Sequence, residues 1–230
     1  MSVLNVSEVS YFRIPLHNIP FEEFPLQISY KYAYCRFFNT LMLTEQKQDF
    51  NILGVYDYFS NEPIADYSVL LNQEWLFGEV LSFNPPLRKE GKWGTIGKQP
   101  IGSVDIRLPH LKFGKDSWFY LKDGVYHAFA GIKSTKEKVA HLEWSYVYGE
   151  NSTKLRIVVE LLKLEAKRQN LNIPLSEWEL IAFKVLRSES ANKKIVDEEL
   201  KQIASTILPD MLEQSIYREV SPELKGSVAP

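Results

Sequence analysis

The chain has 230 residues, 45% of them hydrophobic and 24% charged, so it can bury a substantial core as one large or two small domains. Its single cysteine, Cys35, excludes an internal disulfide, a zinc ribbon, an iron–sulfur cluster and CxxC redox chemistry. The near-neutral net charge of −2 is the sum of two acidic ends and a basic middle.

Residues 1–28 read as an extended lead-in with at most one edge strand. Pro15, Pro20 and Pro25 forbid a long helix there, because each proline removes an amide donor. Residues 29–48 have helical length and apolar faces, with Ser29 as an N-cap, and we predict an N-terminal helix. Their many Tyr and Phe residues leave a strand pair as the alternative.

Residues 51–148 show the pattern of a β-sheet. Short runs rich in β-branched and aromatic residues are separated by Asn, Gly, Pro and Asp. Asp123-Gly124 lies between two such runs and predicts a tight hairpin. No helical stretch separates the runs, so the sheet is expected to be mainly antiparallel. The runs are ILGVYDYF, ADYSVLL, EWLFGEVLSF, GSVDIRL, SWFYLKD, GVYHAFAGI and VAHLEWSYVY.

Residues 85–102 interrupt this sheet with three prolines, four glycines and four basic residues. They show no periodicity and are predicted to be a long loop, which in a compact domain is usually functional or disordered.

The pattern becomes helical after Gly149. Apolar residues on one side predict a helix over 153–169, capped by Asn151 or Ser152. A second helix is expected over 175–187, opened by Ser176 and Glu179 as a capping box. A third spans 193–207 and ends before Pro209, and a short fourth covers 210–218.

The predicted fold class is therefore α+β: a mainly antiparallel sheet over residues ~50–148, an N-terminal helix and a helical C-terminal portion. We expect a sheet-rich domain at 1–148 and a helical portion at 149–220, packed on the sheet or forming a small subdomain. The remainder, 221–230, is expected to be a flexible tail.

Cofactor and catalytic motifs are absent from the sequence. Phosphate-binding loops, the dinucleotide fingerprint and the GxSxG elbow do not occur, and no cofactor is predicted. His110, His127 and His141 fall in the sheet region without metal-ligand spacing, so no metal is assigned, and whether they converge is open.

One catalytic alternative is a Mg²⁺-dependent nuclease. Asp66, Glu79 and Asp105 are acids inside apolar runs, where such an enzyme places its metal ligands. The acid-x-lysine that should follow on a neighbouring strand is missing. A further alternative is a small-ligand-binding protein or enzyme with a sheet-lined pocket.

The basic middle of the chain carries the leading hypothesis. Formal charge is −6 over residues 1–87, +7 over 88–168 and −3 over 169–230, and Trp93, Trp118, Phe119, Tyr120 and Trp144 are interleaved with the basic residues. Clustered positive charge attracts polyanions, and aromatic rings stack on bases.

We therefore expect a non-enzymatic binding or assembly subunit that contacts nucleic acid or an acidic protein surface. The acidic ends are a second possible partner for this segment, within one chain or in an oligomer. The predicted anion-binding residues are Arg88, Lys89, Lys92, Trp93, Lys98, Arg107, Lys112 and Lys115.

Overall fold

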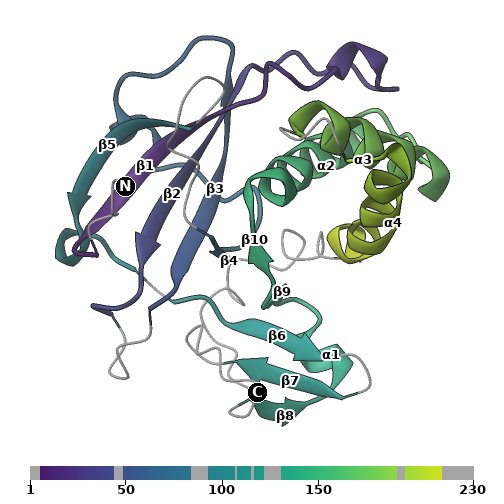
Figure 1. Ribbon diagram of the computed structural model, residues 1–230. Helices are drawn as coiled ribbons and strands as arrows, with labels where there is room; N and C mark the ends of the chain where they lie inside the picture. Colours follow the sequence, from purple (N-terminus) through teal and green to yellow (C-terminus); the bar gives the residue numbers. More distant parts are fainter. Residues whose placement is uncertain are drawn as a thin grey trace.

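The computed structural model describes residues 6–43, 49–83, 93–106, 108–114, 117–121, 131–190 and 195–213. They form an α+β fold with two mainly antiparallel sheets and three long helices, all three in the C-terminal half of the chain (Figure 1). No helix within these ranges is long and apolar enough to span a membrane.

The larger sheet has six strands in the order β10-β4-β3-β2-β1-β5. Its neighbours are antiparallel except for the parallel pair β4–β10 at one edge. The strands are β1 (Glu8–Pro15), β2 (Tyr32–Asn39), β3 (Asn51–Ser60), β4 (Val80–Ser82), β5 (Gly94–Pro100) and β10 (Val147–Tyr148).

The smaller sheet has four strands in the order β8-β7-β6-β9, and only the pair β6–β9 is parallel. It lies beside the larger sheet, with the short helix α1 (Lys136–Val139) against it (Figure 1). The strands are β6 (Leu111–Gly114), β7 (Trp118–Leu121), β8 (Ile132–Ser134) and β9 (Glu143–Trp144).

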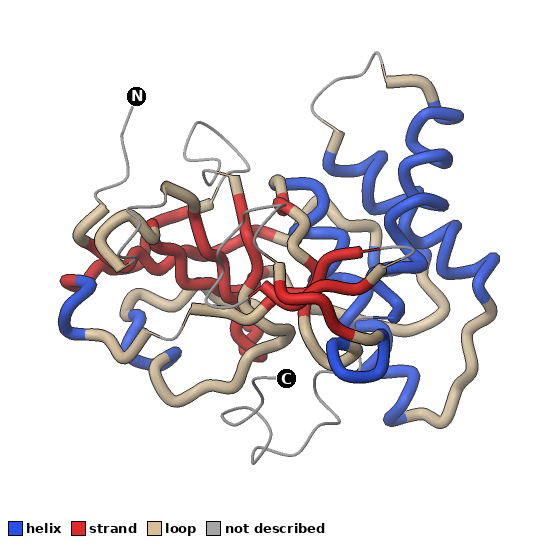
Figure 2. The backbone as a smooth tube through the Cα atoms, turned by 90° about the horizontal axis from the view of Figure 1, so that it is seen from below, coloured by secondary structure: helices blue, strands red, loops and turns tan. Residues whose placement is uncertain are grey.

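The long helices cover one face of the six-stranded sheet. They are α2 (Glu150–Arg168), α3 (Leu175–Glu189) and α4 (Asp197–Glu213), and Figure 2 shows them gathered on one side of the molecule. Side chains from one face of β1, β2 and β3 pack with the buried side of these helices in the first core. Burial of this apolar surface is the main force that holds the helices on the sheet. The members of the first core include Phe12, Cys35, Val55, Leu155, Val159, Trp178, Val185, Leu208 and Met211.

The opposite face of the six-stranded sheet builds a second core. It is rich in tyrosine and reaches into the small sheet, because Leu111 of β6 and Leu121 of β7 are buried in it. The segments between the strands cover it, including the 3-10 helices η2 (Tyr67–Leu70) and η3 (Ile101–Ser103), whereas η1 (Phe21–Glu23) packs on the first core. The second core therefore joins the two sheets.

The predicted N-terminal helix is wrong. Residues 32–39 are strand β2, paired with β1 on one side and β3 on the other. Their side chains are buried on both faces of the sheet, so the apolar residues that resembled two helix faces are the two faces of a central strand. The lead-in differs as well, because β1 is an interior strand with β5 on its second side.

Three other segments depart from the prediction. Residues 94–100, which belong to the loop expected over 85–102, form strand β5. Residues 84–92 lie outside the described ranges. The runs at 65–71 and 102–108 form no strand in their described residues; η2 and η3 occupy parts of them. In the first, Asp66 caps a turn through Ser68, a local bond that competes with strand pairing.

The C-terminal helices agree with the prediction in their extent, except at Pro209, but not in their caps. The N-cap of α2 is Gly149 instead of Asn151 or Ser152, and the N-cap of α3 is Pro174, so the capping box predicted at Ser176 and Glu179 is wrong. Helices α2 and α3 begin and end within a few residues of their predicted limits. Helix α4 instead runs through Pro209 to Glu213, where two helices were expected. Burial of Leu208 and Met211 on the same helix face offsets the lost hydrogen bond. The predicted turn at Asp123-Gly124 and the tail at 221–230 lie outside the described residues.

Candidate functional site

Most of the predicted anion-binding residues fall outside the described ranges. These are Arg88, Lys89, Lys92, Arg107 and Lys115. The other three, Trp93, Lys98 and Lys112, can be placed, and each of them contacts another part of the fold. Trp93 is only 4% exposed and packs against Phe12 in the first core. The Lys98 ammonium lies 3.0 Å from a Glu8 carboxylate oxygen, so an acid of the N-terminal segment pairs with a base of the central one.

The acids of the nuclease alternative have separate surroundings. Asp66 is exposed and accepts hydrogen bonds from the amide and hydroxyl of Ser68, which lower its carboxyl pKa. Glu79 is nearly buried and forms an ion pair of 2.9 Å with Arg36 of β2. Asp105 is exposed in the segment after η3. Within the described residues, no three His, Cys, Asp or Glu side chains form a group that suits a metal ion. The nuclease stays a prediction.

One face of the four-stranded sheet carries a row of three aromatic rings, here called the aromatic row: Trp118 of β7, Trp144 of β9 and Tyr146. The ring centroids of Trp118 and Trp144 are 5.3 Å apart, and those of Trp144 and Tyr146 are 5.4 Å apart with an interplanar angle of 5°. Gly114 of β6 lies opposite Trp118. A Cβ at Gly114 would lie 2.0 Å from the Ser117 carbonyl oxygen, so glycine is required for the tight turn between β6 and β7.

Two lysines contact the aromatic row. The Lys136 ammonium of α1 lies 5.9 Å from the centre of the Trp118 ring. The Lys112 ammonium of β6 lies 5.1 Å from the Trp144 ring and donates a 2.9 Å hydrogen bond to the Ala140 carbonyl. Cations over aromatic faces are attracted by the ring quadrupole. Lys112 is only 4% exposed, and this burial lowers its pKa.

The two ends of the aromatic row are open to solvent, whereas its middle is closed. Tyr146 is 46% exposed and Trp118 is partly exposed, but Trp144 is only 6% exposed. Among the described residues, the indole Nε1 of Trp144 has no hydrogen-bond partner. Lys133, Lys136 and Lys138 are exposed on β8 and α1 beside the Trp118 end. A ligand can therefore reach rings and ammonium groups at the ends of the row.

Two of the three histidines of the sheet region, His110 and His141, lie among the described residues. The Tyr120 hydroxyl lies 3.0 Å from Nδ1 of His110. His141 follows Ala140 at the end of α1, and its pKa is lowered by burial, by Lys112 and by His110. His110 and His141 thus lie in one neighbourhood beside Lys112, and His127 is outside the described residues.

The other face of the same sheet exposes a second pair of rings. Phe113 of β6 and Phe119 of β7 are cross-strand partners with ring centroids 6.3 Å apart. Lys133 of β8 is the partner of Phe119 on its other side and is exposed. Three neighbouring strands therefore present Phe, Phe and Lys on one face.

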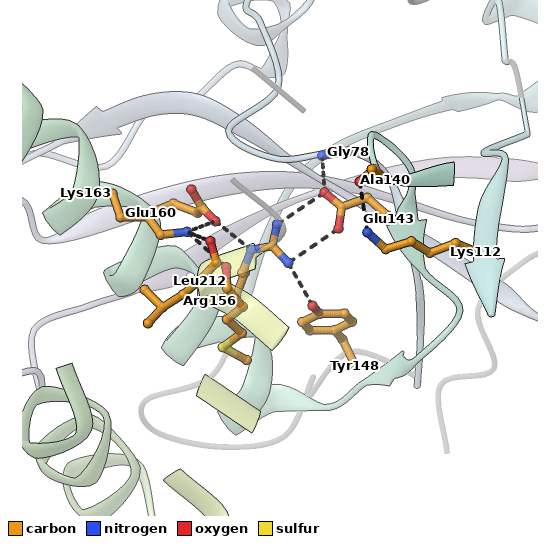
Figure 3. Close-up of polar contacts among 10 residues, drawn as sticks. Gly78, Lys112, Ala140, Glu143, Tyr148, Arg156, Glu160, Lys163 and Leu212 are labelled. Carbon is orange, nitrogen blue, oxygen red and sulfur yellow. Dashed lines mark hydrogen bonds and ion pairs between the residues drawn. The ribbon is translucent and has the colours of Figure 1, made fainter. Parts of the chain in front are cut away.

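A buried ionic network joins this sheet to the helices. The Arg156 guanidinium of α2 is fully buried and donates to Glu143 of β9, to Glu160 and to the Tyr148 hydroxyl (Figure 3). The Glu143 carboxylate also accepts a 3.1 Å hydrogen bond from the Gly78 amide. Buried charges are tolerated only when they are paired and hydrogen-bonded, and these are. The network is best explained as the structural attachment of β9 to α2.

Two members of this site, Tyr146 and Lys136, are not among the residues that the sequence predicted. Trp144 and Tyr146 are two residues apart, a spacing that puts both on one face of an extended segment, so this signal was present. Nothing in the sequence indicates that Lys136 lies over Trp118, because that contact depends on how α1 packs on the sheet.

The chain matches no protein-family model, no curated protein and no solved structure. Any assignment of function therefore rests on the geometry described above.

Proposed function

We propose that this chain is a non-enzymatic binding subunit that holds single-stranded nucleic acid on its four-stranded sheet. The observation that carries the proposal is the aromatic row with its two lysines, Lys112 and Lys136. In this row, three aromatic residues and two lysines of the central segment come together.

The chemistry of the row favours a single strand over other polyanions. Unpaired bases have flat faces that stack on aromatic rings, and each such stack contributes about 1–3 kcal/mol. Phosphates between the bases pair with lysine ammonium groups. An acidic protein partner offers carboxylates that pair with the lysines, but few flat rings that stack on the aromatic row. Such a partner therefore leaves the aromatic rings without a contact.

The exposed lysines extend the row into a larger basic surface. Lys136 and Lys138 lie on α1 next to the Trp118 end, and Lys133 lies on β8. Arg107 and Lys115 belong to the same stretch of sequence and are part of the proposal, although their positions are not described. Lys98 contributes less, because Glu8 already neutralises it.

The test is a fluorescence-anisotropy titration with labelled single- and double-stranded DNA and RNA at two salt concentrations, with and without Mg²⁺. The proposal predicts saturable binding to single strands that weakens steeply with salt, because counterions are released from the phosphates. Cleavage in the Mg²⁺ samples would instead support the nuclease. Absence of binding at low salt would overturn the proposal.

A matched pair of double variants tests the surface itself. K136A/K138A removes two lysines beside the row, while K167A/K201A removes two exposed lysines from α2 and α4. The first is expected to weaken binding about three- to tenfold and to reduce the salt slope by roughly 1–2, and the second to do neither. Equal losses in both variants would show that only net charge matters.

We also propose a cytoplasmic location. Its support is Cys35, a free thiol buried in the first core, where burial raises its pKa well above the ordinary value. Such a cysteine acts as a small hydrophobe. Recovery of the tagged chain in a secreted or periplasmic fraction would contradict this location.

A further inference from the structure

The two ends of the aromatic row offer different chemistry to a ligand. At one end, the Trp144 ring covers one face of the Tyr146 ring, because the two rings are nearly parallel and their centroids are 5.4 Å apart. Tyr146 is nevertheless 46% exposed, so most of its exposed surface belongs to the opposite face and the edge of the ring. At the other end, the Lys136 ammonium lies 5.9 Å from the centre of the Trp118 ring. The first end therefore presents an open ring face, and the second presents a positive charge.

The middle of the row is closed to a ligand. Trp144 is only 6% exposed and contacts both other rings of the row. The Lys112 ammonium, 5.1 Å from the centre of the Trp144 ring, belongs to a side chain that is only 4% exposed. The Ser145 amide donates a 3.0 Å hydrogen bond to the Lys112 carbonyl, which holds the segment after β9 on β6. A base cannot stack on Trp144, and a phosphate cannot reach Lys112, without a rearrangement of the sheet.

Lys112 holds the positive end of the row in place. Its ammonium donates a 2.9 Å hydrogen bond to the carbonyl of Ala140, the C-cap of α1 (Figure 3). Lys136 is the first residue of this helix, and Val139 is buried with Tyr120 of β7 in a small core. The hydrogen bond and this core therefore fix the helix that carries the Lys136 ammonium over Trp118.

The separation of the two ends limits the length of strand that they hold. The ring separations of 5.4 and 5.3 Å and the 5.9 Å from Trp118 to Lys136 place the Lys136 ammonium at most about 17 Å from the Tyr146 ring. Successive nucleotides of a stacked strand advance by about 3.4 Å, so about five nucleotides cover this distance, and fewer are needed when the strand is extended.

We propose that the aromatic row binds a short single-stranded segment at its two ends: one unpaired base stacks on the open face of Tyr146, and a phosphate further along the strand pairs with Lys136. This inference rests on the proposed function of the row. Trp144 and Lys112 are positioning residues that hold the two ends and do not touch the strand. Because every base has a flat face, one stack and one phosphate contact give little sequence preference.

The test compares Tyr146→Ala with Tyr30→Ala in anisotropy titrations of a labelled thymidylate pentamer and dodecamer. Tyr30 is a matched control, because it is 38% exposed and its ring also contacts one aromatic neighbour, Phe59, at 5.3 Å. Tyr146→Ala is expected to raise Kd about five- to hundredfold for both oligonucleotides, which corresponds to the loss of one base stack, with an unchanged salt slope. Tyr30→Ala, and Tyr146→Phe, which keeps the ring, are expected to change Kd by less than about twofold.

A second comparison tests the role of Lys112. Lys136→Met removes a phosphate contact and is expected to lower the salt slope by about 0.7. Addition of Lys112→Met to this variant is expected to lower the slope no further, because Lys112 acts through Lys136. A further fall of the same size would show that Lys112 itself pairs with a phosphate and would overturn its positioning role. If the double variant does not fold, the Tyr146 comparison decides alone.

The outcomes separate this inference from the proposed function. A loss confined to Tyr146→Ala, with the urea midpoint of the parent chain, supports binding at the two ends. Binding that Tyr146→Ala retains within about twofold overturns it and leaves the proposed function standing, and so do equal losses in Tyr146→Ala and Tyr30→Ala. A loss seen with the dodecamer but not with the pentamer overturns the short segment. If the folded parent chain binds neither oligonucleotide at low salt, the proposed function itself fails.

Discussion

Glu143 of β9 and Arg156 of α2 form a buried ion pair, with 3.2 Å between the carboxylate Oε1 and the guanidinium Nη2. The pair joins the small sheet to the helical layer, and both side chains are almost completely removed from solvent. A charge of this kind cannot lose its partner without a large loss of stability.

Removal of one partner is therefore expected to destabilise the fold. Glu143→Gln leaves the Arg156 charge buried with one carboxylate fewer, and we expect a loss of about 3–5 kcal/mol in the free energy of unfolding, measured with urea. Lys201→Ala breaks an exposed pair with Glu198 and serves as the control. Its effect is expected to stay below about 1 kcal/mol. Similar losses in the two variants would contradict the structural role of the network.

Gly97 is expected to resist substitution because of the Tyr67 ring. A Cβ at Gly97 would lie 2.1 Å from Cδ1 of Tyr67, whose ring stacks on Tyr11 in the second core. Gly97→Ala should cost about 1–3 kcal/mol, since overpacking forces the ring or the strand to move. Gly102→Ala is the control, because nothing lies within 4 Å of its added Cβ. Equal urea midpoints for the two variants would show that Tyr67 moves aside without cost.

His141 is expected to make stability fall in mild acid. Burial, Lys112 and His110 hold its pKa below the ordinary 6.5, so the unfolded chain binds a proton more readily than the folded one. This contribution to stability is fully present above pH 6.5 and is lost as the pH falls toward the lower folded pKa. The urea midpoint should therefore drop less between pH 7.5 and pH 5.5 in His141→Asn than in the parent. An identical drop in both would assign the acid sensitivity to other groups.

Pro209 provides a stabilising substitution. It is exposed inside α4, where proline removes one helix hydrogen bond and crowds the preceding turn. Pro209→Ala is expected to raise the free energy of unfolding by about 1–2 kcal/mol, less than the full penalty of proline because alanine also loosens the unfolded chain. A lower urea midpoint would show that the proline ring itself makes a needed contact.

Local signals in the sequence were enough for some elements and misleading for others. Helices α2 and α3 were predictable because apolar residues recur along one side of each. Strand β2 was not, since a central strand buried on both faces has no polar side to reveal its period. Pro209 gave a strong stop signal that tertiary burial of Leu208 and Met211 overrides.

The candidate site depended on contacts between distant segments, and so only its composition was predictable. Trp118, Trp144 and Lys112 were recognised as members of a basic, aromatic stretch, and the pairing of β6 with β9 brings them together. The acidic ends were suggested as internal partners, and Glu8 with Lys98 is one such contact.

The most direct test of the central claim is to follow the indole N–H signals of the ¹⁵N-labelled protein in ¹H–¹⁵N NMR spectra while a single-stranded oligonucleotide is added. The chain has five tryptophans, each assignable by a Trp→Phe variant. Trp118 and Trp144 belong to the aromatic row, whereas Trp93 and Trp178 are buried in the first core. The account predicts that the Trp118 and Trp144 signals shift in a saturable way while those of Trp93 and Trp178 stay in place. Binding that leaves Trp118 and Trp144 unmoved would contradict it.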